Sequence, residues 1–231
     1  MIVILTGAGI SQESGIATFR DAGGLWENAR IEDVATPRGF ARDPDRVLEF
    51  YNQRRKQLLE EAVAPNAAHH ALARLEREHG EQVLLVTQNV DNLHERAGSA
   101  NLLHMHGELL KARCLACGKS FAWKDDMSRA DACPRCGKQG RLRPHILWFE
   151  EMPLPMDAIE RALSSCRLFV SIGTSGNVYP AAGFVQTASS HGGRTLELNL
   201  ERSAGARSFH DGRYGRASLI VPQWVEEILR G

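Results

Sequence analysis

The chain has 231 residues, of which 43% are apolar and 24% are charged, as in an ordinary globular protein. Its 28 basic and 28 acidic side chains cancel, which argues against a protein that binds nucleic acid or an anionic membrane through a basic excess. The sequence has neither an apolar run long enough to span a bilayer nor a signal-peptide pattern. We therefore expect a cytoplasmic protein with no membrane partner and no stable nucleic-acid partner.

The first predicted strand, residues 2–5, runs directly into the turn Gly7-Ala8-Gly9-Ile10. A Gly-x-Gly turn after a strand lets backbone N–H groups approach a pyrophosphate. The dinucleotide-binding fingerprint has another glycine at its sixth position, where this chain has Gln12. A nucleotide site and an ordinary turn between a strand and a helix therefore both remain open.

Residues 30–64 are predicted to be helical and to contain no strand. Asp43 and Pro44 form an N-cap and first-residue pair that opens a helix. On that helix Arg54 falls on the apolar stripe three residues after Tyr51, so the two side chains share one face. An arginine at such a position most often extends its charged end to water.

Strands and helices then alternate along the chain. We predict a helix over residues 66–79, capped by Asn66, and a buried strand over residues 83–87. Later elements repeat the pattern, with helices over 158–166, 179–190 and 222–229 and strands over 168–172, 195–200 and 219–221. Such alternation, with strands that contain continuous apolar runs, predicts an α/β fold with a doubly wound parallel sheet covered on both faces.

Short segments with polar side chains follow two of these strands. They are Gln88-Asn89-Val90-Asp91 and Gly173-Thr174-Ser175. The carboxyl ends of parallel strands line the ligand crevice, where amide side chains suit a carboxamide or ribose hydroxyls. As alternatives, Asp91 could cap the next helix, and the second segment could be an ordinary tight turn.

His104 and His106 end a further apolar run, and alternation places them on the same side of a strand. A histidine at such a place can be a general base, because its ordinary pKa of about 6.5 suits proton transfer at neutral pH. A structural role is the more common one for a single histidine, and the chain has nine.

Four of the five cysteines form two Cys-x-x-Cys pairs, Cys114 with Cys117 and Cys133 with Cys136. Two thiolate pairs at this spacing close a tetrahedral zinc site with no open position. This predicts one structural Zn²⁺ in a reduced compartment; a redox motif and a zinc ribbon that binds nucleic acid are the alternatives. Cys166 lies outside both pairs, and we expect a buried thiol on a helix.

In their order along the chain, these motifs resemble those of the sirtuin family, the NAD-dependent protein-lysine deacylases. The resemblance is carried by Gly7-Ala8-Gly9-Ile10-Ser11, Ser14-Gly15-Ile16, Phe19-Arg20, Thr87-Gln88-Asn89-Val90-Asp91, His106-Gly107, the two Cys pairs and Gly173-Thr174-Ser175. Segments 35–54 and 104–153 are most similar to the bacterial class III type, which is linked to cobalamin biosynthesis in enterobacteria. The resemblance implies a single catalytic domain over residues 1–231. Its large Rossmann-like lobe would comprise 1–29, 65–109 and 145–231, and its small lobe a helical insert at 30–64 and a zinc module at 110–144.

The resemblance also implies the roles of individual residues. NAD, as a co-substrate, would be bound in the cleft between the lobes by Gly7, Ala8, Gly9, Ile10, Phe19, Arg20, Trp26, Gln88, Asn89, Val90, Asp91, Gly173, Thr174, Ser175, Asn199, Leu200, Glu201 and Ala217. The substrate's acyl oxygen would expel nicotinamide from the ribose, with His106 as general base. The products would be free lysine, nicotinamide and O-acyl-ADP-ribose. An NAD-linked dehydrogenase and a zinc-ribbon binding module without catalysis are the alternatives.

The acyl pocket of the class III type is matched by Tyr51, Arg54 and Ala35, and Leu147 and Phe149 would also contact the acyl-lysine protein or peptide. A phenol and a guanidinium can bind the terminal carboxylate of a succinyl or malonyl group. We therefore expect removal of these groups as well as of acetyl groups. A substrate strand would pair with main chain near residues 146–149 and 177–178.

Two positions depart from the family pattern. Ala17 stands where the family usually has proline, which would loosen the cofactor loop in the free state. Glu150 stands where the family usually has glycine, which would strain the backbone if φ is positive there.

Overall fold

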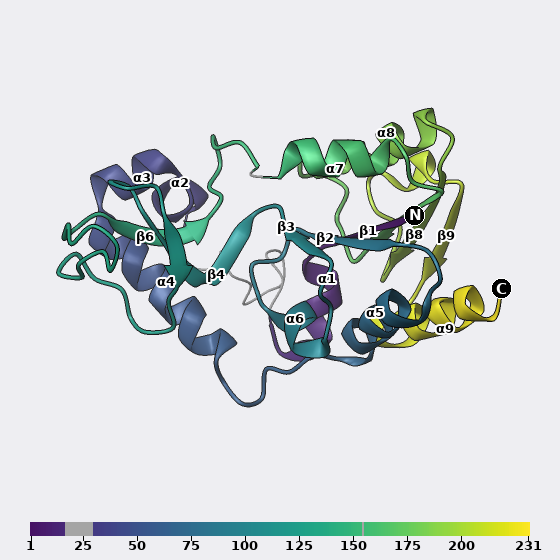
Figure 1. Cartoon of the computed structure of the whole chain (residues 1–231), viewed down its shortest axis with the longest axis horizontal. Helices are drawn as coiled ribbons and strands as arrows, with labels where there is room; N and C mark the ends of the chain where they lie inside the picture. The colour runs from purple at the N-terminus through teal and green to yellow at the C-terminus, as the bar shows by residue number, and fades with distance from the viewer. Residues whose placement is uncertain (17–29, 154) are drawn as a thin grey trace.

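The computed structural model describes residues 1–16, 30–153 and 155–231. Its largest feature is a six-stranded parallel sheet in the order β3-β2-β1-β7-β8-β9 (Figure 1). The strands are β1 (Ile2–Thr6), β2 (Val83–Thr87), β3 (Leu102–His104), β7 (Leu168–Ile172), β8 (Arg194–Asn199) and β9 (Asp211–Tyr214). All five strand pairs are parallel, so their carboxyl ends lie along one edge. The order reverses between β1 and β7, which is the switch point where doubly wound sheets bind ligands.

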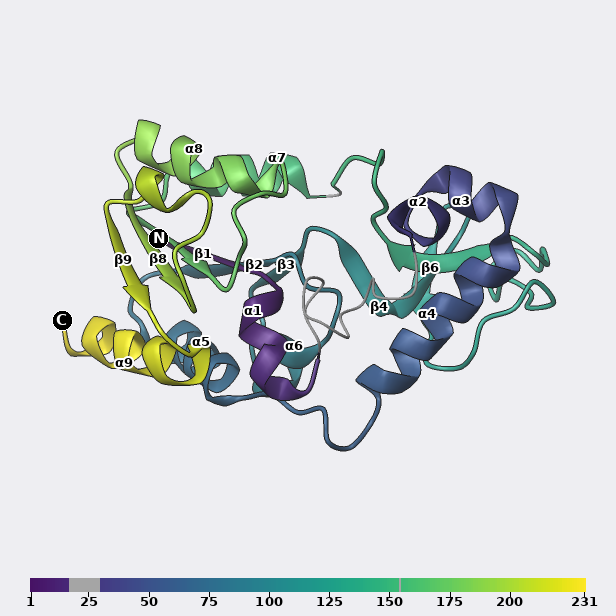
Figure 2. The same cartoon turned by 180° about the vertical axis from the view of Figure 1, so that it is seen from behind.

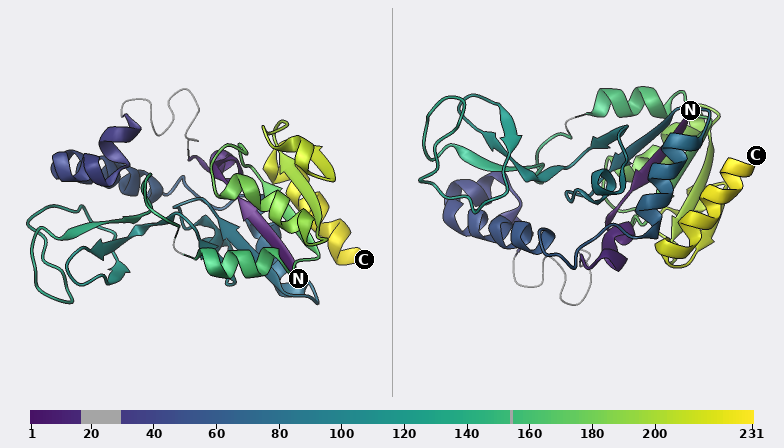
Figure 3. Two further views of the ribbon diagram at one scale, coloured as in Figure 1. Left: turned by 90° about the horizontal axis from the view of Figure 1, so that it is seen from above. Right: turned by 60° about the horizontal axis from the view of Figure 1, so that its bottom comes forward.

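Helices cover both faces of this sheet (Figures 1 and 2). One face carries α5 (Ala67–Glu78) and α9 (Ala217–Arg230), and the other carries α7 (Met156–Leu163) and α8 (Phe184–Ser190). The views from above and below keep the two helix pairs on opposite sides of the strands (Figure 3). The predicted α/β class and the doubly wound parallel sheet are confirmed.

The alternation of side chains along β1 explains why four consecutive apolar residues are stable in this strand. Ile2 and Ile4 pack with α5 and α9 in one core, and Val3 and Leu5 pack with α7 and α8 in the other. All four side chains are at most 3% exposed. Burying each contributes about 1.5–3 kcal/mol, so the apolar run is satisfied on both faces at once.

A second, three-stranded sheet lies at the other end of the molecule, beside three helices (Figure 1). Its strands are β4 (Gly107–Cys114), β5 (Ser120–Ala122) and β6 (Leu142–Ile146), and the helices are α2 (Ile31–Val34), α3 (Pro37–Arg42) and α4 (Pro44–Leu58). The pairs β4–β5 and β4–β6 are antiparallel. Short elements complete the described chain: α1 (Ala8–Ser11), η1 (Gln12–Ser14), α6 (Leu93–Ala97), η2 (Ala181–Gly183) and η3 (Ala206–Ser208).

Helix α4 is joined to the second sheet by buried polar contacts. The amide of Asn52 donates to the carbonyl of Met127 at 3.0 Å and accepts from the Met127 N–H at 2.8 Å. Arg55, only 1% exposed, donates to the carbonyl oxygens of Leu109 and Asp125 at 3.3 and 3.2 Å. These bonds make the helical insert and the segment between the cysteine pairs one packed unit.

The structure corrects several predicted elements. Residues 219–221 belong to α9, which contains Pro222 and begins at Ala217; three apolar residues are too few to separate a strand from a helix. The last strand is β9, whose polar composition is that of a sheet edge. Helix α7 ends at Leu163, so Cys166 is buried beyond it, and the predicted helix 179–190 becomes η2 followed by α8. No helix among the described residues is both long and apolar enough to cross a bilayer.

Candidate active site

The turns after β1 and β7 pack directly against each other at the switch point. The N–H of Gly7 donates to the carbonyl of Ile172 at 3.0 Å, and that of Gly9 to the carbonyl of Gly173 at 2.9 Å. A Cβ atom at Gly9 would lie 2.8 Å from Cα of Gly173, and one at Gly173, where φ is +62°, would lie 2.5 Å from the nitrogen of Ile10. Close backbone approach therefore requires these glycines, and the edge they form is one that a phosphate can approach closely.

The polar residues that follow β2 form a buried network behind these turns. The amide nitrogen of Asn89 donates to the carbonyl of Gly7 at 3.2 Å and to Ser11 Oγ at 3.0 Å. Ser11 donates to Oδ2 of Asp91 at 3.0 Å, while Oδ1 accepts from the N–H of Leu93, also at 3.0 Å. Burial raises the pKa of Asp91. Asp91 thus caps the start of α6, as the alternative interpretation of this segment expected, and it also fixes Ser11. Ser11 is not among the predicted site residues.

Two buried histidines that sequence reasoning missed support this network. The rings of His69 and His94 lie 4.8 Å apart. Nε2 of His94 is 3.0 Å from Thr6 Oγ1, and Nε2 of His69 is 3.5 Å from Ser11 Oγ. Burial lowers the pKa of His69 to about 4 and that of His94 well below its ordinary value. Both rings are therefore neutral at pH 7, and their only signal in the sequence was the position of each near a helix start.

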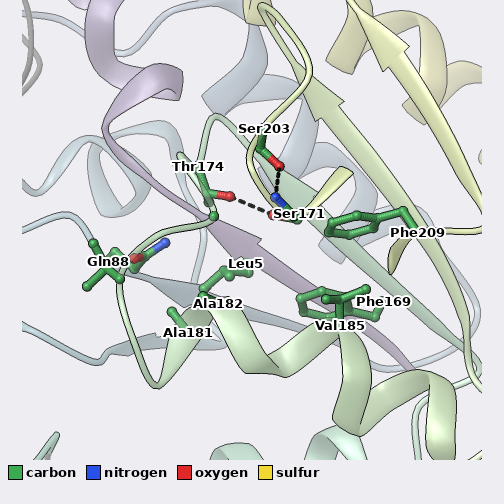
Figure 4. Close-up of a pocket in the computed structure, with 13 residues that line it drawn as sticks. Leu5, Gln88, Phe169, Ser171, Thr174, Ala181, Ala182, Val185, Ser203 and Phe209 are labelled. Atoms are coloured by element: carbon green, nitrogen blue, oxygen red, sulfur yellow. Dashed lines mark hydrogen bonds between the residues drawn. The ribbon is translucent and has the colours of Figure 1, made fainter. Parts of the chain in front are cut away.

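Gln88 and Thr174 line a small cavity between the ends of β1 and β7 and the start of α8 (Figure 4). Its volume of about 20 Å³ holds about one water molecule, so this cavity is not itself a nucleotide site. The hydroxyls of Thr174 and Ser171 lie 2.9 Å apart, and the amide of Asn199 donates to the carbonyl of Thr174 at 2.7 Å. The predicted residues after β7 and β8 are therefore brought together.

The remaining predicted cofactor residues divide into two groups. Leu200 and Glu201 are exposed in the segment after β8, and Ala217 begins α9. The start of α9 is tied to the segment after α1, since the N–H and hydroxyl of Ser218 donate to Glu13 at 3.1 and 2.6 Å. Three other predicted residues, Phe19, Arg20 and Trp26, lie outside the described residues, as does Ala17.

His106 lies in the turn between β3 and β4, so the expectation that both histidines end one strand is wrong. The chain bends because Met105 is fully buried in the sheet core and Gly107 has φ +82°. Nδ1 of His106 lies 3.1 Å from the carbonyl oxygen of Gln88. A carbonyl only accepts, so Nδ1 carries the hydrogen and Nε2 is the basic nitrogen. Burial lowers the pKa of His106.

His104 occupies a different environment. Its Nδ1 lies 3.1 Å from the carbonyl of Asn89, and its Nε2 lies 2.8 Å from a carboxylate oxygen of Glu95. Burial acts to lower the pKa of His104, but the hydrogen bond and charge of Glu95 outweigh it and raise the pKa. Both ring nitrogens are therefore engaged, and His104 is the less suitable base of the two.

The four paired cysteines converge at the end of the second sheet. Their Sγ atoms all lie within 4.8 Å of one another, and the distances from Cys114 to Cys136 and from Cys117 to Cys133 are both 3.8 Å. Zn–S bonds of about 2.3 Å in a tetrahedron place sulfurs about 3.8 Å apart. A glycine with φ near +70°, Gly118 or Gly137, follows each pair. Its N–H donates to the carbonyl oxygen of the first cysteine of that pair. This donor set fits one structural zinc ion.

Of the predicted acyl-pocket residues, Tyr51 and Ala35 lie in one buried cluster, and Arg54 of the same helix as Tyr51, α4, lies against Phe50. Tyr51 is 6% exposed, and its hydroxyl accepts from the indole N–H of Trp148 at 2.9 Å. Ala35 is buried in the same apolar cluster as Tyr51 and Trp148. The Arg54 guanidinium carbon lies 4.8 Å from the centre of the Phe50 ring, and partial burial lowers the pKa of Arg54. The structure thus keeps Arg54 half-buried rather than fully extended into water.

The segment after β6 runs beside this cluster and beside His106. The N–H of Leu147 donates to the carbonyl of His106 at 2.8 Å, and that of Phe149 to the carbonyl of Ala35 at 3.0 Å. These bonds occupy both N–H groups, so the substrate strand expected there cannot pair with either of them. Glu150 has φ +75°, so the strained backbone expected at this position is confirmed.

Comparison with known proteins gives one consistent result. The model of the Sir2 family matches residues 7–180. The chain is 59% identical over 228 residues to an "NAD-dependent protein deacylase" of Pasteurella multocida (99% of this chain, 97% of the relative). It is 61% identical over 228 residues to a protein of the same name from Vibrio cholerae (99% and 93%).

Solved structures agree with the sequence relatives. A Sir2 homologue in complex with NAD has a TM-score of 0.89 at 38% identity, covering 99% of this chain and 89% of that one. Sir2Af2 bound to a myristoylated histone peptide has a TM-score of 0.77 at 31% identity, covering 99% and 91%.

Proposed function

The chain belongs to the Sir2 family, and we propose that it is an NAD-dependent protein-lysine deacylase with His106 as its general base. One observation carries the choice of base. The N–H of Gln88 donates to the carbonyl of Thr6, at the end of β1, at 2.9 Å, and the Gln88 carbonyl lies 3.1 Å from Nδ1 of His106. A single residue therefore holds a neutral imidazole beside the switch point, where doubly wound folds bind nucleotides.

The residues around the switch point fit NAD in three parts. The two packed glycine turns present main chain that suits the pyrophosphate. The Asn89–Ser11–Asp91 network is rigid and suits the nicotinamide end, for which we assign Gln88, Asn89, Val90 and Asp91. For the adenosine end we assign Thr174, Ser175, Asn199, Leu200, Glu201 and Ala217.

NAD supplies the ribose carbon that the substrate's acyl oxygen attacks as nicotinamide leaves. This chain provides the base that receives the proton of a ribose hydroxyl. The oxygen of that hydroxyl then attacks the acyl carbon. Nε2 of His106 accepts that proton, and the carbonyl of Gln88 stabilises the resulting imidazolium through Nδ1–H. Because burial lowers the pKa of His106, the ring is in its basic form at neutral pH.

Tyr51 and Arg54 support acidic acyl groups as substrates in addition to acetyl. Burial raises the pKa of Tyr51 well above its ordinary value, so its hydroxyl is protonated and can donate to a carboxylate. The Arg54 guanidinium, on the same helix face, supplies the positive charge and a bidentate donor pair. The small side chain of Ala35 leaves room for an acyl group longer than acetyl.

The partners implied are acyl-lysine proteins or peptides, as for the histone peptide bound to Sir2Af2. The zinc ion would be structural, since four thiolates leave no coordination position for a substrate. Four reduced thiols suit the cytoplasm, which keeps cysteines reduced.

A substrate series on one peptide tests the proposal. The peptide carries acetyl-, succinyl-, malonyl- or butyryl-lysine, and kcat/KM is measured for each with NAD in excess. We expect succinyl- and malonyl-lysine to be better substrates than butyryl-lysine, the matched control that has the length of succinyl without its carboxylate. A preference for butyryl over succinyl would contradict the acidic-acyl assignment and leave deacylation intact. If the protein removes none of these acyl groups in the presence of NAD, deacylation itself is contradicted.

A further inference from the structure

We propose that Trp148 is a positioning residue for acyl specificity, which acts by fixing the hydroxyl of Tyr51. The inference rests on the proposed removal of acidic acyl groups. The indole N–H of Trp148 donates to the Tyr51 oxygen at 2.9 Å, across 97 residues of sequence. That bond occupies one lone pair, and the hydroxyl hydrogen is repelled from the direction of the indole N–H. The Tyr51 O–H is therefore restricted to the remaining directions before a substrate arrives.

The Trp148 ring is itself packed against two other side chains. The guanidinium carbon of Arg143 lies 3.3 Å from the ring centre, and the ring of Phe40 lies 5.2 Å away at an angle of 44°. The side chain is only 2% exposed. A ring packed in this way has one orientation, so its N–H has one direction.

A partly buried ion pair fixes the segment that carries Trp148. Arg143 donates to Glu151 through two nitrogens, at 2.7 and 3.0 Å, and to the carbonyl of Ile146 at 2.6 Å. Glu151 also accepts from the main-chain N–H of Trp148 at 2.8 Å. The bidentate geometry adds directional precision, so the main chain and the ring of Trp148 are held from the same carboxylate–guanidinium pair.

Pre-organisation matters here because the Tyr51 phenol must meet a charged group in a buried place. An O–H that is free to rotate loses freedom when it binds a carboxylate, whereas one already restricted loses less. Donation from the indole also polarises the phenol and strengthens its own hydrogen bond. An acetyl group has no carboxylate, so neither effect extends to acetyl-lysine.

The test is a double-mutant cycle read on two substrates. Trp148→Phe keeps an aromatic ring beside Arg143 and Phe40 but removes the indole N–H together with part of the ring volume, and Tyr51→Phe removes the hydroxyl. For the unaltered protein, each single variant and the double variant, kcat and KM are measured on succinyl- and acetyl-lysine forms of one peptide. Zinc content and melting temperature serve as folding controls.

We expect Trp148→Phe to lower the ratio of succinyl to acetyl kcat/KM about fivefold to tenfold, mainly through the KM for the succinyl peptide, as for loss of one hydrogen bond. In the Tyr51→Phe background the same change should leave that ratio unaltered, because the hydroxyl it positions is gone. Equal losses on both substrates, or an undiminished effect in the Tyr51→Phe background, would show that Trp148 only packs. If the unaltered protein removes acetyl but not succinyl, the proposed acyl class fails and the inference fails with it.

A second measurement does not depend on the folding of Trp148→Phe. The chain has only three tyrosines, so labelling tyrosine with ¹³C at Cζ gives three resonances, and Tyr51→Phe identifies one of them. With unaltered protein, the Tyr51 signal should move on addition of succinyl-lysine peptide and move less with acetyl-lysine peptide. A Tyr51 signal that responds equally to both peptides would overturn the inference.

Discussion

Nδ1 of His106 lies 3.1 Å from the carbonyl oxygen of Gln88, and this single contact decides which nitrogen of the ring is basic. A carbonyl cannot donate, so the hydrogen is on Nδ1 and the lone pair is on Nε2. His104, two residues earlier, has instead a carbonyl at one nitrogen and the carboxylate of Glu95 at the other. The two histidines are therefore a matched pair for testing the general base.

His106→Ala is expected to reduce kcat about 100- to 10,000-fold, which is the usual effect of losing a general base. The affinity for NAD should stay within a few fold, because the ring acts after nicotinamide has left. Steady-state deacylation and NAD titration measure the two quantities. His104→Ala is the control; if it is the more damaging change while the protein stays folded, the assignment of the base is reversed.

The pH profile of kcat/KM distinguishes the same two residues without a mutation. A general base is active only when neutral, so activity falls as the pH drops through its pKa. Burial lowers the pKa of His106 below 6.5, whereas Glu95 outweighs burial and raises that of His104 above 6.5. We expect the acid limb of the profile, measured with acetyl-lysine peptide, to lie below pH 6.5. An acid limb centred above pH 6.5 would favour His104.

Loss of zinc is expected to unfold the second sheet and the segments around the four cysteines. A four-thiolate zinc ion contributes about 10 kcal/mol or more, which is comparable to the total stability of a domain, about 5–15 kcal/mol. Cys114→Ala should lower both zinc content and melting temperature, whereas Cys166→Ala, outside the cluster, should retain the zinc. Metal analysis and thermal unfolding measure this. Full zinc content and an unchanged melting temperature in Cys114→Ala would contradict the structural zinc site.

Arg54→Met is expected to lower kcat/KM for succinyl-lysine peptide about 10- to 150-fold relative to acetyl-lysine peptide. A hydrogen bond to a charged group contributes about 1.5–3 kcal/mol, and each 1.4 kcal/mol is tenfold. Methionine keeps most of the packing of the arginine stem against Phe50. Parallel kinetics on the two peptides give the ratio; the same loss on both would mean that Arg54 is a structural residue.

The parts of the fold that the sequence predicts well are those covered on both faces. β1, β2 and β7 each contain a run of consecutive apolar residues, because each strand contacts two layers of helices, and such a run is visible in the sequence. β9 and the three strands of the second sheet have no such pattern, because β9 is a sheet edge and the others lie in a small sheet beside the cysteine cluster and the helices α2, α3 and α4.

The features of the candidate site also differ in whether a local sequence pattern predicts them. The glycine turns and the paired cysteines are local motifs, so their positions in the sequence suffice to predict that each group comes together. The contact between Trp148 and Tyr51 and the support of Ser11 by His69 join residues 97 and 58 positions apart, and no local pattern predicts them. The apolar stripe points to Arg54, although the fold buries its neighbour Arg55 more completely, to 1% exposure.

The central claim is that the chain couples removal of a lysine acyl group to cleavage of NAD. It is tested most directly by incubating the protein with NAD and succinyl- or acetyl-lysine peptide and measuring free nicotinamide, deacylated peptide and absorbance at the NADH wavelength together. We predict one nicotinamide for each lysine freed, no NADH, and no nicotinamide without the acyl-peptide. Formation of NADH without nicotinamide would indicate a dehydrogenase, and an NAD level that stays constant in the presence of acyl-peptide would indicate a binding protein; either result would contradict the account.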